Sequence, residues 1–182
     1  MIDSTVVLYG QTIAYTIYAI VIILLMLAFG YMITKDGKAG VLKTSVFSIL
    51  VAGLVVLGVS LHIATNVTIP WVAMDLNRHD ITPDKVFDII VENHEFQLPE
   101  DMVLKVGEIV VFDVVSNDLT YGFGIFREDG TMVTQMQVVP GKHRNDLMWQ
   151  FVNPGSYTIR STEYSGPKGH QMVIKDALLV TE

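Results

Sequence analysis

The sequence has no cysteine among its 182 residues. No disulfide can therefore stabilise the fold, and sites that need a thiolate are excluded, including iron–sulfur clusters and thiolate copper centres. Common catalytic signatures are missing as well. There is no Gly-rich phosphate loop, no nucleophile elbow and no HExxH zinc motif. The sequence thus predicts no catalytic residues in this chain.

Basic residues are scarce in the larger, C-terminal part of the chain. From Thr65 to Glu182 there are 17 Asp and Glu against 9 Lys and Arg, a net charge of −8. This balance argues against nucleic acid and against an anionic membrane surface as partners. It permits a basic protein partner without requiring one.

Charged residues are absent from two long apolar runs, Thr12–Ile33 and about Ser45–Ala64. Each has the ~20 residues needed to cross a bilayer, and in lipid each must be helical. We predict a transmembrane hairpin within residues 1–66, with helices at about 12–34 and 44–65. The first run could instead be a signal peptide, but no Lys or Arg precedes Lys35 and the run is too long.

The connection Lys35–Lys43 predicts the topology, because it holds three lysines and a single aspartate. Short basic loops stay on the cytoplasmic side of a membrane. We therefore expect a multi-pass protein of the cell membrane, with its N-terminus and its large C-terminal domain outside. His62 is the one ionisable side chain in a predicted span and is a functional candidate for that reason. Its place within a turn of the outer boundary favours a water-accessible, interfacial histidine.

The remainder of the chain reads as an interfacial linker over residues 67–84 and an all-β domain over residues 85–182. Pro70 and Trp71 are expected to anchor the linker at the membrane surface. Short alternating apolar segments separated by turn residues predict seven or eight strands and a Greek-key sandwich or barrel. The expected strands are 86–92, 102–106, 109–115, 122–126, 132–138, 146–151, 156–161 and 171–180.

Five motifs in this domain follow one another in a distinctive order: FQLP, VLKVGEIVVF, SNDLTYGFGI, VVPGK and FVNPGSYTIRSTEYSGPKGHQM. This order resembles subunit II of the haem–copper oxidase superfamily, the cytochrome c oxidase subunit II-like proteins. The resemblance extends from Thr12 to about Lys175 and includes the two-helix hairpin. It implies that the outer domain is a cupredoxin-like barrel.

In electron-accepting members of this family the barrel holds CuA, a dinuclear copper centre. Its motif is a histidine before GF, then C-x-E-x-C-G, then a histidine and a methionine. The matching positions here are Tyr121, Ser161, Glu163, Ser165, Gly166, His170 and Met172. One extra residue separates Ser165 from His170, and one fewer separates His170 from Met172.

The resemblance therefore implies a degenerate CuA site. Bridging a mixed-valence copper pair requires thiolates, whereas a serine hydroxyl is a hard ligand whose pKa is too high for it to bind as an alkoxide. We expect no metal and no cofactor in this chain. A residual mononuclear site formed by Glu163, His170 and Met172 is the less favoured alternative, because three ligands with altered spacing do not close a site. The other outer-domain histidines, at positions 79, 94 and 143, are expected at the surface.

The function that the resemblance implies is that of a non-catalytic subunit of a terminal oxidase in the aerobic respiratory chain. Family members without CuA belong to complexes that oxidise membrane quinol and reduce oxygen. The implied partners are subunit I, which would carry the haems and CuB, quinol, and further small membrane subunits. Proton pumping by such a complex is left open. One alternative is subunit II of a quinol-dependent nitric oxide reductase, and another is a free-standing membrane-anchored binding module.

Overall fold

The computed structural model of the protein describes residues 4–34, 44–141 and 145–182. Two predictions rest on residues outside these ranges, namely the whole basic connection Lys35–Lys43 and His143. The chain divides into two compact units, Ser4–Val72 and Ala73–Glu182.

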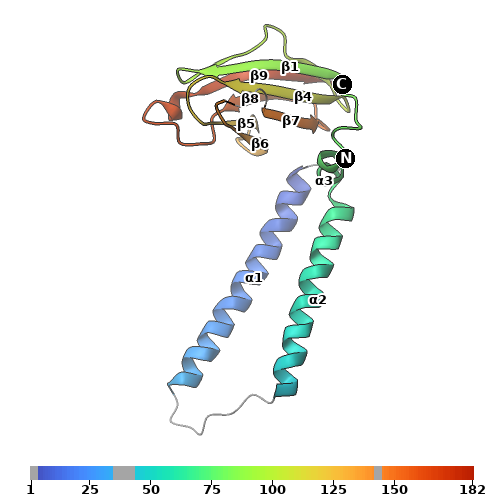
Figure 1. Ribbon diagram of the computed structural model, residues 1–182, viewed down its shortest axis with the longest axis vertical. Coiled ribbons are helices and arrows are strands. Elements are labelled where there is room, and N and C mark those ends of the chain that lie inside the picture. Colours follow the sequence, from blue (N-terminus) through green and yellow to red (C-terminus); the bar gives the residue numbers. More distant parts are fainter. Residues whose placement is uncertain (1–3, 35–43, 142–144) are drawn as a thin grey trace. The chain divides into compact units, whose positions relative to one another are not determined.

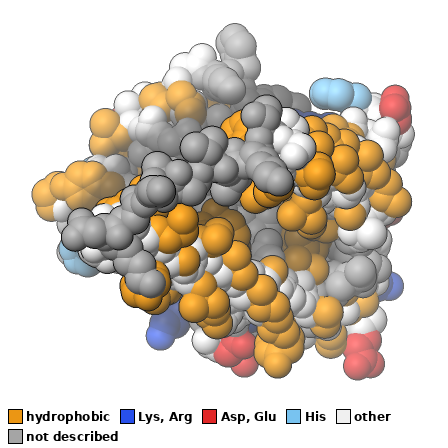
Figure 2. Space-filling view, turned by 90° about the horizontal axis from the view of Figure 1, so that it is seen from below, with side chains coloured by type: hydrophobic (Ala, Val, Ile, Leu, Met, Phe, Trp, Pro, Cys, Tyr) orange, Lys and Arg blue, Asp and Glu red, His pale blue; other side chains and the backbone are white. Residues whose placement is uncertain are grey.

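The first unit consists mainly of two long helices, α1 (Ser4–Ile33) and α2 (Thr44–Thr68), each of which is continuous in Figure 1. Both are long and apolar enough to cross a membrane, and their most apolar stretches bury no side chain within the structure. At ~1.5 Å per residue, each exceeds the ~30 Å hydrocarbon core of a bilayer. Hydrophobic side chains accordingly dominate the space-filling view in Figure 2.

Several threonine side chains in these helices bond to their own backbone. The Thr12 hydroxyl donates to the carbonyl of Leu8 at 2.9 Å, and the Thr65 hydroxyl donates to that of Leu61 at 2.8 Å. Such local bonds satisfy hydroxyls that would be costly to leave unpaired in lipid. His62 is exposed, six residues before the end of α2.

A short helix, α3 (Pro70–Leu76), lies in the stretch that was expected to be a linker. Proline is favoured at the first position of a helix, where a backbone N–H has no partner to lose. Met74, near its end, is buried in the second unit. Arg78 follows the helix and forms an ion pair with Asp146, which fixes this segment to the β domain.

Nine strands and one 3₁₀ turn form the described part of the second unit. They are β1 (Lys85–Glu92), β2 (Glu95–Gln97), β3 (Val103–Lys105), β4 (Ile109–Ser116), β5 (Tyr121–Arg127), β6 (Met132–Val138), β7 (Asn145–Gln150), β8 (Gly155–Arg160), η1 (Gly169–Gln171) and β9 (Val173–Thr181).

These strands form two sheets, in the orders β2-β1-β4-β7 and β3-β9-β8-β5-β6. Pairing is antiparallel except for β1 with β4 and β3 with β9, which are parallel. The arrangement is a β-sandwich preceded by two long apolar helices, so the predicted fold class is confirmed.

Alternation between buried and exposed residues explains the sandwich. Along β1 the side chains of Phe87, Ile89 and Val91 are buried, and the residues between them are exposed. Inward-facing rings fill the space between the sheets, with the ring centres of Phe112 and Phe123 5.5 Å apart. Strand β5 departs from the alternation, because six of its seven residues are buried. A cover on its outer face is therefore required.

Candidate functional site

The cover on β5 is the segment between β8 and β9, which carries most of the positions singled out in the sequence. Two glycines of β5 leave the space in which this segment packs against the strand. A Cβ atom at Gly122 would lie 2.2 Å from Thr162 Oγ1 and 2.4 Å from the Thr162 backbone nitrogen. A Cβ at Gly124 would lie 2.5 Å from Thr162 Cγ2. Glycine is thus required at both positions for the segment to lie this close to the strand.

Ser161 joins this segment to β5 by a hydrogen bond. Its hydroxyl accepts the backbone N–H of Gly122 at 3.3 Å and donates to the carbonyl of Glu163 at 3.3 Å. The side chain of Glu163 is exposed. Both hydrogen-bond partners of the Ser161 hydroxyl are therefore neutral backbone groups.

Ser165 and Met172 lie together at the end of the segment. The Ser165 hydroxyl is 3.9 Å from Met172 Sδ, and Met172 is buried. Gly169 fits against the same serine, since a Cβ there would lie 2.8 Å from Ser165 Oγ. A side chain at position 169 would have to displace Ser165.

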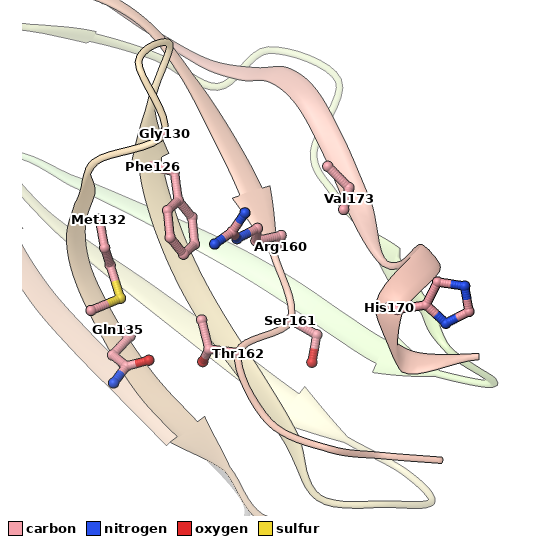
Figure 3. A pocket seen from close by; sticks show the side chains of 9 residues that line it. All are labelled: Phe126, Gly130, Met132, Gln135, Arg160, Ser161, Thr162, His170 and Val173. Atoms are coloured by element: carbon pink, nitrogen blue, oxygen red, sulfur yellow. The ribbon is translucent and has the colours of Figure 1, made fainter. Parts of the chain in front are cut away.

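His170 does not join these residues. It lies in η1, where its Nδ1 is 2.7 Å from the carbonyl of Pro167, and it is exposed. Its ring is turned outward in Figure 3. Because Glu163 is exposed too while Met172 is buried, the three residues of the alternative mononuclear site do not share one environment.

Tyr121 begins β5 and is fully buried. Its hydroxyl donates to Asp118 Oδ2 at 3.0 Å and accepts the backbone N–H of His94 at 3.2 Å. Burial raises the pKa of the Tyr121 phenol above its ordinary value of 10.0, and the bonded carboxylate of Asp118 adds to the effect. The phenol is therefore neutral at physiological pH and acts as a donor.

Asp118 remains a carboxylate beside this phenol. Desolvation alone would raise its pKa, but the backbone N–H groups of Asn93 and Leu119 and the Tyr121 hydroxyl together lower it. The bonds from Asn93 and Leu119 measure 2.8 and 2.7 Å. Three donors to one carboxylate stabilise its charged form.

His94 completes the group and was not expected in it, since the sequence predicted a surface histidine. Its ring is partly buried, edge-on to Tyr121 with ring centres 5.7 Å apart, and its Nε2 is 2.7 Å from the Ser165 carbonyl. Asn93 and His94 both have positive φ, 53° and 67°, in the tight turn between β1 and β2. That turn aims the ring at a residue 71 positions away, so no local pattern could have revealed it.

This arrangement offers few side chains that could bind a metal. Among the described residues, no three His, Asp or Glu side chains come together. Tyr121, Ser161 and Ser165 offer neutral hydroxyls, each with a protein partner within the site. A dinuclear copper centre needs thiolates and imidazoles, so the residues present do not fit it.

Comparisons with known proteins give similarities in fold only. No family model and no curated protein matches the sequence. A chain of a haem–copper terminal oxidase dimer, solved by cryo-EM, is 20% identical, with 76% of this chain and 97% of that chain covered and a TM-score of 0.47. The periplasmic domain of cytochrome oxidase subunit II from Bradyrhizobium japonicum is 14% identical, covering 56% and 87%, with a TM-score of 0.42. Auracyanin B is 13% identical, covering 56% and 92%, with a TM-score of 0.44.

Proposed function

We propose that this chain is the non-catalytic subunit II of a membrane-bound haem–copper oxidase that takes electrons from quinol. The ordered motifs of its β domain and the apolar helix pair before that domain support the proposal. In this proposal the helices anchor the chain beside subunit I, which carries the haems and CuB. The β domain lies on the extracytoplasmic side.

The choice of quinol is supported by the hydroxyls of Tyr121, Ser161 and Ser165. They stand where the family resemblance would place copper ligands, and each hydrogen-bonds to a protein group. A soluble cytochrome docks outside the membrane and needs an electron acceptor close to its docking site. Without a copper pair in the β domain, the electron would have to cross the whole domain in one step. A lipid-soluble quinol avoids this step because it reaches subunit I from within the bilayer.

The acidic surface of the domain does not alter this choice. Its charge would attract a basic cytochrome and raise the rate of encounter. Attraction supplies no redox centre, so encounter without an acceptor produces no turnover. The chain would then contribute assembly and coverage of the outer face of subunit I.

Turnover of the purified native complex tests the proposal. We expect oxygen consumption with a reduced quinol analogue and none above background with reduced cytochrome c. Fast, quinone-independent turnover with cytochrome c would contradict the proposal, provided that metal and haem analysis finds no additional redox subunit. Repeating the assay with nitric oxide in place of oxygen tests the reductase alternative.

Purification separates a subunit from a free-standing module. A subunit of an oxidase co-purifies with haem, which is visible in the absorption spectrum of the detergent-solubilised complex. A free-standing module migrates alone and is colourless. Isolation of the chain alone under conditions that keep other respiratory complexes intact would refute the proposal.

A further inference from the structure

A second feature borders the segment after β8, and the proposed function does not use its arginine. It is an open hollow of about 590 Å³ at the strands β5, β6, β8 and β9. We term it the Arg160 hollow. Its lining includes Phe126, Met132, Gln135, Arg160 and Val173, and it shares Ser161, Thr162 and His170 with the candidate site described above. Figure 3 shows these side chains gathered from several elements. The volume falls in the range of small-molecule sites.

Arg160 is held in place by an aromatic ring. Its guanidinium carbon is 3.7 Å from the ring centre of Phe126, and Phe126 itself is buried. Arg160 is otherwise exposed, so this contact places the guanidinium over the ring face while its N–H edges stay open to a partner. Such an edge matches the two oxygens of a carboxylate in a bidentate pair.

No protein carboxylate takes this position. Within the described residues, the ion pairs involve Arg78 and Lys85 but not Arg160. Of the residues that the structure describes, no Asp or Glu lines the hollow, although acidic residues outnumber basic ones 17 to 9 from Thr65 onward. The hollow is therefore a cationic site on an acidic domain, and its charge favours the binding of an anion.

Other residues of the lining indicate what the remainder of an anionic ligand would look like. Gln135 lies directly opposite Gly124 in the pairing of β5 with β6 and presents an amide. Met132 and Val173 offer apolar surface, with 44% and 45% of their area exposed. A ligand with one carboxylate and an apolar body would use all of these groups, whereas inorganic phosphate would leave the apolar surface uncovered.

We propose that the Arg160 hollow binds a small organic carboxylate with an apolar body. The carboxylate pairs with the Arg160 guanidinium, the Gln135 amide donates a further hydrogen bond, and the body lies on Met132 and Val173. The proposal does not depend on the electron donor of the complex, so either proposal can fail alone.

Calorimetric titration of the full chain in lipid nanodiscs tests this site, with phenylacetate as the probe. We expect saturable one-site binding, weaker by at least about tenfold in Arg160→Gln because a charge-assisted bidentate pair is lost. Lys168→Gln is the matched control: it removes the same charge from an exposed residue outside the hollow and should leave the affinity unchanged. Arg160→Lys keeps the charge without the planar fork and should bind with intermediate affinity.

Two further measurements protect the test against a folding defect in Arg160→Gln. Gln135→Ala leaves the stacked guanidinium in place and should weaken binding by a few-fold. In the wild-type chain, 2-phenylethanol and inorganic phosphate should each bind at least about tenfold more weakly than phenylacetate. Absence of saturable phenylacetate binding, equal binding by Arg160→Gln, or equal binding of the uncharged analogue or of phosphate would overturn the proposal.

Discussion

The hydrogen bond between Tyr121 and Asp118 should be a measurable source of stability, and Tyr121→Phe removes it without changing the packing of the ring. The hydroxyl is fully buried and bonds to a carboxylate at 3.0 Å. Bonds to charged groups contribute about 1.5–3 kcal/mol, and we take the lower end because Asp118 is exposed to solvent. The His94 N–H also loses its acceptor, which brings the expected cost to about 2 kcal/mol.

The assay is thermal and denaturant unfolding of the full chain in detergent, followed by near-ultraviolet circular dichroism. A loss of about 2 kcal/mol in a domain of this size should lower Tm by on the order of 10 °C. Tyr157→Phe is the control, since the Tyr157 hydroxyl is similarly buried but donates to a backbone carbonyl, that of Asn153, at 2.7 Å. It should cost about 1 kcal/mol.

The pH dependence separates a charge-assisted bond from simple packing. Folding lowers the pKa of Asp118 below its ordinary 3.8, so its charged form stabilises the fold above that pH. This stability is lost as the pH falls through the lower, folded-state pKa. The difference between wild type and Tyr121→Phe should therefore shrink below pH 3.8, while that of Tyr157→Phe should not. A Tyr121→Phe effect that is no larger than the control and equally insensitive to pH would refute the reasoning.

Three further predictions test the site and the topology. Copper added to the full chain should give neither the purple colour nor the multiline paramagnetic resonance of a mixed-valence pair, because Ser161 and Ser165 cannot bridge it; either signal would contradict this. In the cysteine-free chain, a cysteine at Gly37 should resist an impermeant thiol reagent in intact cells and one at Gly130 should react; the opposite pattern would reverse the topology. Gly122→Ala should destabilise the β domain by more than about 2 kcal/mol, because its Cβ meets backbone atoms; a loss below 1 kcal/mol by denaturant unfolding would show that the segment can move away.

The architecture was predictable because its signals are local. Uncharged runs of sufficient length indicate the two helices, and period-two alternation indicates strands such as β1. The limits of α1 were not predictable in the same way. The structure begins this helix at Ser4, and the residues from there to Gln11 carry no charge, proline or capping pattern that fixes a start near Thr12.

The site was predictable only in part, because its contacts join distant segments. Ser161, Ser165 and Tyr121 could be singled out by comparison with a family motif. Asp118 and His94 could not, since their roles depend on a turn with positive φ and on pairing across the sandwich. The parallel pairing of β1 with β4 is equally invisible in the sequence, because alternation determines which face is buried and not which strand lies alongside.

The network around Tyr121 connects the segment between β8 and β9 to two other parts of the β domain. Here Ser161 bonds to Gly122, and His94 links the Ser165 carbonyl to the turn between β1 and β2. Tyr121 holds the same turn from the other side through the His94 N–H. Hydrogen bonds among neutral partners and one carboxylate thus hold this segment against the rest of the β domain. In the proposed subunit II, the same bonds would maintain the shape of the β domain for its contact with subunit I.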